Sequence, residues 1–226
     1  EIDAQNKKWF IASGYLYDLT GTTITFHQVG NSTTATSITI DPLNNMWVGT
    51  KNEGLWKYDG VNWTNIQYPN IASNNVTDIE FDHNGDIWVA TGTDLSSYIY
   101  GGINKYSSGN WSLITTGQYS SCRHISKDKL GMVWIAGNND YVNLETSVKY
   151  SVYVPNTFAC FYVDQQNNLW TGTWSGLYKL NQGVLTNYSL SNACIPYRSN
   201  TVYGVGFDSN NKPWIALYNE YLQGAS

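Results

Sequence analysis

The sequence has few charged residues, and its charges are not clustered. Asp, Glu, Lys and Arg make up 13% of the 226 residues, and the formal net charge is −5. No run of Lys or Arg suggests a phosphate-binding face, so we do not expect a nucleic-acid partner. No stretch of about 18 consecutive apolar residues occurs either, so we expect no membrane insertion.

Cysteine is also scarce. The chain has three cysteines, Cys122, Cys160 and Cys194. An odd number defines no disulfide framework, and their spacing fits no metal site. We expect them to be buried as small apolar side chains. The sequence therefore predicts neither a metal site nor a cofactor.

The composition also bears on the location of the protein. Low charge with abundant Asn, Ser and Thr favours an exported protein, although no signal-peptide pattern is visible. The chain begins at Glu1 rather than at Met, which suggests a mature or trimmed product. We expect a periplasmic or extracellular location.

Aromatic and turn-forming residues are abundant. The chain has 10 Trp, 18 Tyr and 20 Gly, and 15% of its residues are aromatic. Aromatic residues favour strands, whereas Asn, Gly and Ser favour turns. This composition predicts many short strands joined by tight turns.

An Asp followed six residues later by Trp recurs six times along the chain. The pairs are Asp3–Trp9, Asp41–Trp47, Asp82–Trp88, Asp128–Trp134, Asp164–Trp170 and Asp208–Trp214. The residues between them, as in "DPLNNMW" and "DHNGDIW", are mostly turn formers, and we expect each Asp to accept bonds from backbone amides. We predict repeats near residues 1–35, 36–73, 74–119, 120–156, 157–200 and 201–226.

Each repeat reads as four short strands. An apolar strand precedes the Asp, a second contains the Trp, a third follows a Gly as in "GLWKY", and a fourth comes after it. A small residue stands two places after most of these Trp, where it would let sheets approach, while the Trp would wedge between sheets. In the first repeat the small residue, Ala12, comes one place later, so we expect a bulge there. Repeated four-stranded units of about 40 residues predict an all-β fold, a β-propeller; a β-sandwich with accidental repeats is the alternative.

Two stretches closely resemble a known repeat. "ITIDPLNNMWVGTKNEGLWKYDGVNW" and "IEFDHNGDIWVATGTD" are similar to the two-component regulator propeller repeat. The resemblance extends over all six units, although unit four lacks the Gly before its third strand. It implies a sensor region like those outside the membrane in hybrid histidine kinases. Related repeats occur in secreted binding proteins and in streptogramin-lyase-like propellers.

The count of repeat units predicts the number of blades. Six units predict one domain over residues 1–226 with six blades and an imperfect closing blade. Five blades, or a fragment of a larger propeller, are the alternatives. An open blade edge would be a site for self-association or for a protein partner.

Two loops between second and third strands exceed the structural minimum. The interval from the Trp to the first apolar residue of strand three is seven or eight residues in units one, two and five. It is 15 in unit three, from Trp88 to Ile103, and 14 in unit four, from Trp134 to Val148. Loops longer than the fold requires are often functional.

These loops and their neighbours hold aromatic rings beside amides and carboxylates. Rings stack on the C–H surface of a sugar while amides and carboxylates bind its hydroxyl groups, so we predict an oligosaccharide or another polar ligand. For any single ring, packing between loops is the alternative. The predicted binding residues are Asp94, Tyr98, Tyr100, Asn139, Asp140, Tyr141, Trp174, Tyr197, Arg198 and Tyr218.

The sequence favours recognition over catalysis. Only His27, His83 and His124 are present, and no second histidine accompanies His124 in the pattern of the lyase-like propellers. Cys122 and His124 would share a strand face, but about 7 Å apart, which is too far for direct activation. We therefore expect a non-catalytic sensor-like propeller, with a protein-interaction propeller segment or a lyase-like enzyme as alternatives.

Overall fold

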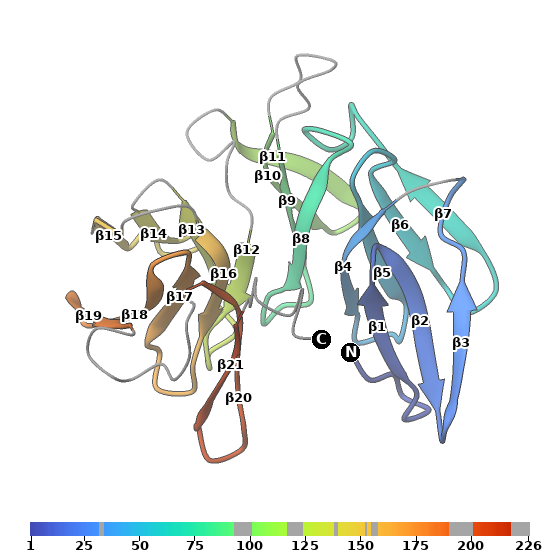
Figure 1. Ribbon diagram of the computed structural model, residues 1–226. Coiled ribbons are helices and arrows are strands. Elements are labelled where there is room, and N and C mark those ends of the chain that lie inside the picture. The colour runs from blue at the N-terminus through green and yellow to red at the C-terminus, as the bar shows by residue number, and fades with distance from the viewer. Residues whose placement is uncertain are drawn as a thin grey trace. The chain divides into compact units, whose positions relative to one another are not determined.

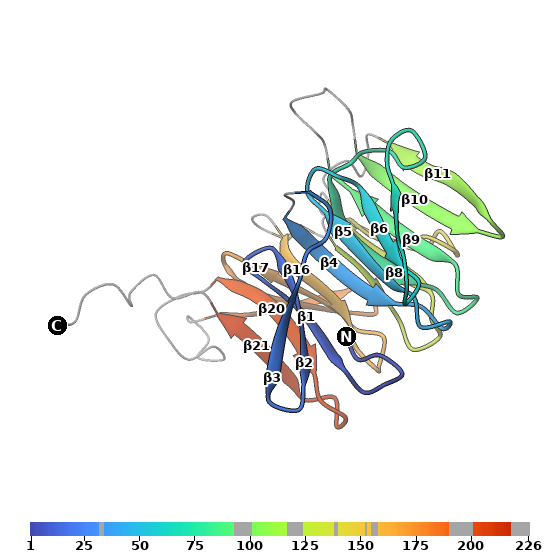
Figure 2. The same cartoon turned by 90° about the vertical axis from the view of Figure 1, so that its right-hand side faces the viewer.

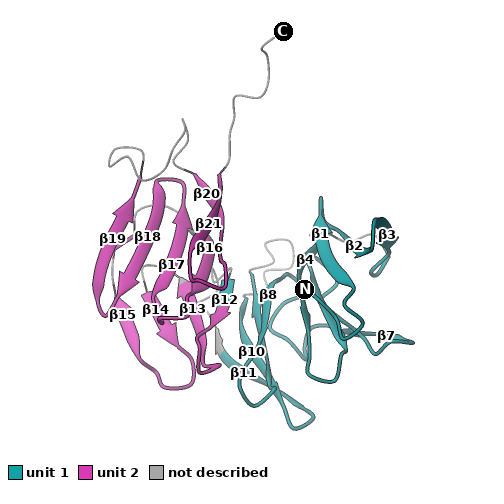
Figure 3. Cartoon of the chain, turned by 90° about the horizontal axis from the view of Figure 1, so that it is seen from below, with its two compact units in different colours: residues 1–125 teal, residues 126–226 magenta. Residues whose placement is uncertain are grey.

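The computed structural model describes residues 1–31, 34–92, 101–116, 124–137, 140–151, 153–154, 158–189 and 201–217. Every regular element in these ranges is a β-strand (Figure 1). The chain divides into two compact units, residues 1–125 and 126–226, which we describe separately (Figure 3).

The first unit contains three antiparallel sheets that follow one another along the chain. The first has strands β1 (Lys8–Ala12), β2 (Tyr15–Thr20) and β3 (Thr23–His27). The second has β4 (Ala35–Ile40), β5 (Met46–Thr50), β6 (Leu55–Tyr58) and β7 (Trp63–Ile66). The third has β8 (Val76–Phe81), β9 (Ile87–Thr91), β10 (Gly102–Ser107) and β11 (Asn110–Thr116). Figure 2 labels β4, β5 and β6 of the second sheet and β8 to β11 of the third, and neighbouring strands of each sheet follow chain order.

The second unit continues the pattern. The fourth sheet has β12 (His124–Lys127), which crosses the boundary between the units, β13 (Val133–Gly137), β14 (Asp140–Asn143) and β15 (Lys149–Ser151). The fifth has β16 (Phe158–Val163), β17 (Leu169–Thr173), β18 (Gly176–Asn181) and β19 (Val184–Tyr188). The sixth has β20 (Val202–Phe207) and β21 (Pro213–Leu217).

The hydrogen bonds of each Asp–Trp turn account for the spacing of six residues. In the third sheet Asp82 Oδ1 accepts the amide N–H groups of Asn84 and Asp86, at 2.9 and 3.0 Å. Its other oxygen accepts the indole N–H of Trp88 at 2.9 Å. The carboxylate thus closes the turn and fixes the indole ring that follows it. The bonds that it accepts from backbone amides are those that the sequence predicts for the repeat Asp. The same indole bond joins Asp3–Trp9, Asp41–Trp47, Asp128–Trp134 and Asp164–Trp170, at 2.8 to 3.1 Å.

Five of the six repeat tryptophans are at most 9% exposed, as expected for rings that wedge between sheets, whereas Trp214 is 66% exposed. Trp47 is 4% exposed and lies in a cluster with Phe81 and Val89 of the third sheet. The small residue after the Trp sits where backbones come close: a Cβ on Gly172 would lie 2.6 Å from the carbonyl oxygen of Val202. Burial of these rings and this close approach hold adjacent sheets together.

A lysine on the third strand pairs with the tryptophan across the sheet. Trp47 is opposite Lys57, and the Lys57 ammonium lies 5.1 Å from the ring centroid. The same pairing joins Trp88 to Lys105 at 4.6 Å and Trp170 to Lys179 at 5.2 Å. Such cation–π contacts explain the Lys of "GLWKY" and its counterparts. The first and fourth sheets depart from this pattern, with Asp18 opposite Trp9 and Asn143 opposite Trp134.

The prediction of a β-bulge at Ala12 is wrong. The β1–β2 ladder stays in register from Lys8↔Leu19 to Ala12↔Tyr15. The two-residue turn at Ser13 and Gly14, with φ of 51° and 78°, reverses the chain directly after Ala12. A hairpin turn with positive φ at both central residues matches the strand twist without an extra residue.

The prediction of a long loop between the second and third strands of the fourth sheet is also wrong. The stretch "DYVN" within the proposed insertion forms β14, the third strand, and residues 138–139 alone connect it to β13. The "SVKY" stretch contributes β15, the fourth strand. The extra residues lie in the turn from 144 to 148, where Asn143 Oδ1 accepts the amides of Glu145 and Thr146. An Asn-initiated turn thus replaced the Gly that we took as the mark of a third strand.

Candidate functional site

Seven of the ten predicted binding residues lie outside the described residues. They are Asp94, Tyr98, Tyr100, Asn139, Tyr197, Arg198 and Tyr218. The loop that carries the first three does have its predicted length, because residues 92–101 connect β9 to β10. Asp140, Tyr141 and Trp174 remain to be placed.

Asp140 lies at the start of β14 and is engaged within its own sheet. Its carboxylate lies 2.7 Å from Lys149 Nζ and accepts a hydrogen bond from Ser151 Oγ at 2.7 Å. Burial raises the pKa of Asp140, but the bonds from Lys149 and Ser151 outweigh burial and hold that pKa below its usual value. The carboxylate is therefore ionised and already partnered.

Tyr141 belongs to the core and not to a binding surface. Its side chain is fully buried against Trp134 and Phe161, and its hydroxyl lies 2.8 Å from Thr171 Oγ1. Burial raises the pKa of this phenol to about 12. A ring with no exposed face cannot stack on a ligand, so the prediction for Tyr141 is corrected. The error follows from reading β14 as a loop.

Trp174 has the exposure that a stacking residue needs. It is 61% exposed and stands in the two-residue connection between β17 and β18. Thr173 fixes this connection, because its hydroxyl accepts the amide of Ser175 and donates to the carbonyl of Gly176, both at 3.0 Å. The ring is thus presented on a short, hydrogen-bonded turn.

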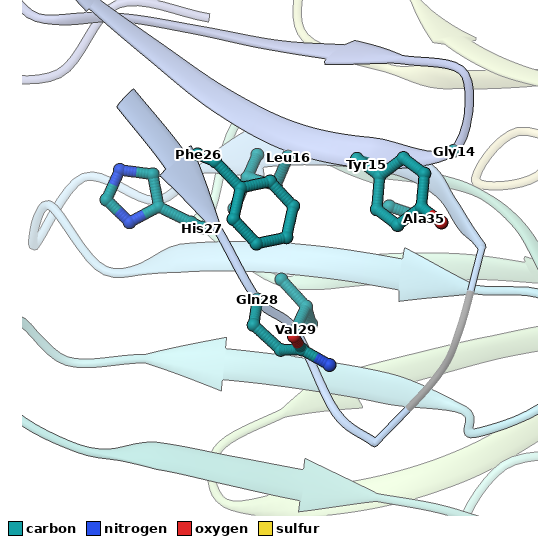
Figure 4. Close-up of a pocket in the computed structure, with 8 residues that line it drawn as sticks. All are labelled: Gly14, Tyr15, Leu16, Phe26, His27, Gln28, Val29 and Ala35. Atoms are coloured by element: carbon teal, nitrogen blue, oxygen red, sulfur yellow. The ribbon is translucent and has the colours of Figure 1, made fainter. Parts of the chain in front are cut away.

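The first unit holds a hollow that the sequence did not predict. We call it the loop-side hollow, because it lies at the same end of its sheet as the connection between second and third strands (Figure 4). Its volume is about 230 Å³. It is lined by Gly14, Tyr15, Leu16, Phe26, His27, Gln28, Val29 and Ala35.

Two exposed aromatic rings stand at this hollow. Tyr15 is 53% exposed and Phe26 is 50% exposed, and their ring centroids lie 5.8 Å apart in an edge-to-face arrangement. Ala35 donates its amide to the Gly14 carbonyl at 2.7 Å, which ties the start of β4 to the β1–β2 turn. Exposed rings on a fixed backbone suit contact with an apolar ligand face.

His27 supplies a polar group whose position is set from inside the sheet. Its Nε2 lies 2.5 Å from Oδ2 of Asp18, which is 2% exposed and also receives a bond from Thr20 Oγ1 at 3.0 Å. Lys7 Nζ lies 3.5 Å from the same carboxylate oxygen. Burial raises the pKa of Asp18, but the hydrogen bonds from His27 and Thr20 outweigh burial and keep that pKa below its usual value.

The partner of His27, Asp18, stands at a position where the first sheet departs from the repeat. Asp18 stands opposite Trp9, at the position where Lys57, Lys105 and Lys179 stand in other sheets. The repeat does not require a carboxylate there. The Asp of "YLYDL", set against the Lys of "GLWKY", was the signal in the sequence that could have directed attention to His27.

A second hollow lies at the opposite end of β1, beside the Asp–Trp turns. It has a volume of about 330 Å³, and Lys7, Trp9, Met46 and Tyr58 are among the residues that line it. The polar groups around it largely bond to the protein: Asn44 bridges to the preceding turn, and the Tyr58 hydroxyl donates to Gly60 O at 2.8 Å. We therefore prefer the loop-side hollow as the candidate site.

His124 lies on a first strand, as predicted, beside a carboxylate. Its Nδ1 is 3.6 Å from Asp78 Oδ2, and that oxygen accepts the amide of Ile125 at 2.9 Å. Cys122 lies outside the described residues, so the proposed Cys–His pair is not tested. The arrangement places one imidazole beside one carboxylate on strands β12 and β8.

Other features of the described residues bear on the class of site. Cys160 is 9% exposed, as expected for a small apolar side chain, and burial raises the pKa of its thiol to about 11. Within the described ranges no three His, Cys, Asp or Glu side chains gather where they could hold a metal ion. No helix in those ranges could span a membrane.

Comparison with known proteins identifies the fold. The extracellular domain of BT3049 from B. thetaiotaomicron, assigned as a hybrid two component system, is 20% identical with a TM-score of 0.74. The match covers 96% of this chain and 32% of that one. Virginiamycin B lyase from Staphylococcus aureus is 16% identical with a TM-score of 0.75, covering 96% and 75%. A gluconolactonase from Xanthomonas campestris is 12% identical with a TM-score of 0.67, covering 95% and 80%. No curated protein matches the sequence significantly.

The antiparallel sheets and these structural matches define the class: the fold is a β-propeller. The six sheets of the described residues agree with the six repeat units, while the blade number of the complete fold stays a prediction. More particularly, residues 70–93 match the model of the two component regulator propeller. They span β8, the Asp82 turn and β9, so the resemblance seen in the sequence is confirmed for this repeat.

Proposed function

We propose that the chain is a non-catalytic recognition propeller of an exported sensor, and that it binds an oligosaccharide through the loop-side hollow. The observation that carries this proposal is the pair of exposed rings, Tyr15 and Phe26, on one face of the first sheet at the loop-side hollow, which His27 also lines from the other face of the same edge strand. Rings cover the apolar face of a sugar, and a fixed polar group binds a hydroxyl. The similarity to extracellular domains of two component systems supports the sensing role.

The ligand surface in this proposal extends to other loops between second and third strands. Trp174 offers a ring on such a loop in the second unit. The proposal retains the predicted residues of the β9–β10 connection, which has the length expected of a functional loop. It also retains Asn139, Tyr197, Arg198 and Tyr218, while Asp140 would act through its partnered carboxylate.

A glycan array followed by calorimetric titration of the hits tests the proposal. We expect Tyr15→Ser and His27→Ala each to weaken binding of the selected oligosaccharide by at least tenfold, because each removes a direct contact. Tyr162→Ser is the matched control, since Tyr162 is 37% exposed but lies in the second unit on β16. Affinity that is unchanged in both hollow variants would rule out this site.

A lyase is the second candidate function, favoured by one observation. Asp78 and His124 place a carboxylate beside an imidazole on first strands, and one structural relative is a lyase that was crystallised with quinupristin. On the recognition proposal, incubation with quinupristin leaves its chromatographic retention time unchanged, whereas elimination would give a ring-opened isomer with a different retention time. If the unaltered chain converts quinupristin and His124→Ala does not, the function is catalysis and not recognition.

A further inference from the structure

Two connections at the loop end of the second sheet carry polar side chains beside an exposed aromatic ring. The connection between β5 and β6 contains Lys51 and Asn52, which are exposed, and Glu53, which is half-buried. The connection between β7 and β8 contains Gln67 and Tyr68, and Tyr68 is 54% exposed. We call these five residues the second-sheet rim. All of them belong to the first unit.

Hydrogen bonds join the second-sheet rim to the loop-side hollow. The Lys51 amide donates to the carbonyl of Thr34 at 3.0 Å, and Thr34 directly precedes Ala35, which lines the hollow. Glu53 Oε2 accepts the amide of Asn31 at 3.2 Å, in the connection from β3 to β4 whose first residues also line the hollow. The rim and the hollow are therefore neighbours within one unit.

The backbone that carries Tyr68 is fixed on both sides. The Tyr68 amide donates to Asn74 Oδ1 at 2.8 Å, and the Asn74 carbonyl accepts the amide of Gly54 at 2.9 Å. Ile71, which lies between Tyr68 and Asn74 in the chain, is 1% exposed and anchors the connection in the core. A ring on a fixed backbone loses less conformational entropy when it binds a ligand than a ring on a mobile loop.

Glu53 lies between the hollow and the connection that carries Tyr68. Its carboxylate is bonded to Asn31 on one side, and its carbonyl accepts Gln67 Nε2 at 3.2 Å on the other. Among the residues that the structure describes, neither Glu53 Oε1 nor the Tyr68 hydroxyl has a hydrogen-bond partner. An exposed ring can cover the C–H face of a sugar, and a carboxylate oxygen can accept bonds from its hydroxyl groups.

We propose that the second-sheet rim is a second subsite, in which Tyr68 stacks on a further sugar unit and Glu53 binds hydroxyl groups between the two units. The ligand class is then a linear oligosaccharide that spans the first and second sheets, and not a single sugar. This inference rests on the proposed function, because it requires the first sugar unit to bind in the loop-side hollow.

A length series of the glycan selected on the array tests the inference. Calorimetric titration with fragments from one sugar unit upward gives the affinity at each length. We expect the affinity of the unaltered chain to rise about tenfold at the fragment that first reaches the rim, as for one aromatic stacking contact. Tyr68→Ser should lose this gain. Tyr15→Ser should weaken binding at every length, because it removes a contact in the first subsite.

Two control variants separate stacking from other effects. Tyr68→Phe keeps the ring and should retain most of the gain with length. Tyr153→Ser removes a ring that is 74% exposed in the second unit, and it should bind every fragment as the unaltered chain does. The bonds that hold the Tyr68 connection do not involve the Tyr68 side chain, so Tyr68→Ser should have the urea midpoint of the unaltered chain.

The results distinguish this inference from the proposed function. If affinity does not rise with length, or if Tyr68→Ser binds the longer fragments as tightly as the unaltered chain, the second subsite is overturned and recognition at the hollow stands. If no fragment binds at any length, the proposed function and the second subsite both fail.

Discussion

At the scale of single residues, each repeat aspartate has two tasks. One carboxylate oxygen closes the turn through backbone amides, and the other fixes the indole six residues later. The interval of six residues therefore follows from the hydrogen bond that joins the carboxylate to the indole N–H. Because the aspartate, the turn and the ring are close along the chain, this part of the structure could be predicted almost entirely from sequence.

Removing one such carboxylate has a predictable cost. Asp82 is 6% exposed, and its side chain also lies 3.1 Å from Lys105 Nζ. Asp82→Ala leaves a buried indole N–H and two turn amides without an acceptor, so we expect a loss of about 3 kcal/mol in the free energy of unfolding. Urea denaturation measures this loss.

The sixth sheet supplies the control for that measurement. Asp208 makes the same turn, but its Trp214 is exposed to water. Water can replace the lost acceptor there, so Asp208→Ala should cost about 1 kcal/mol or less. Equal losses in the two variants would show that burial of the pair does not set its contribution.

At the scale of elements, the distance between neighbouring sheets depends on the residue two places after the tryptophan. Gly49 and Gly172 sit against a side chain and a backbone of the next sheet, whereas Ala90 and Ala136 occupy the same position elsewhere. The sequence predicted that a small residue was needed. It did not predict how closely each pair of sheets approaches, because that distance depends on residues about 30 positions away.

Gly172→Ala tests this spacing. Its new methyl group would meet Cys160 Sγ at 2.5 Å and Val202 O at 2.6 Å, so the fifth and sixth sheets would be forced apart. We expect a loss of about 1–3 kcal/mol in the free energy of unfolding, measured by urea denaturation. Gly206→Ala, which meets no atom within 4 Å, should change stability little. A similar loss in both variants would contradict the packing explanation.

At the scale of the whole molecule, carboxylates in both units tie stability to pH. Burial raises the pKa values of Asp3, Asp18, Asp82 and Asp164, but hydrogen bonds to their side chains more than offset it, so these pKa values lie below the ordinary one. A carboxylate with a depressed pKa contributes stability that is fully present above the pKa of the unfolded chain. That contribution disappears as the pH falls through the folded pKa.

We therefore expect the urea midpoint to be level near neutral pH and to fall steeply below about pH 4, where unfolded Asp side chains take up protons. Asp82→Asn should be less stable than the unaltered chain at pH 7 and should lose less stability on acidification, because it has one depressed carboxylate fewer. Parallel pH profiles for the two proteins would contradict this account.

The sequence alone determined the all-β repeat, the Asp–Trp turns and the burial of most repeat tryptophans. Each of these depends on hydrogen bonds and side-chain alternation within about ten residues, so the pattern is visible in the order of the letters. Tertiary structure decided that Tyr141 is core, that "DYVN" is a strand, and that Tyr15, Phe26 and His27 share a hollow. It also decided that Trp214 is exposed while the five other repeat tryptophans are buried. Those outcomes depend on which sheet lies against which, and burial is a property of neighbours that are distant in the chain.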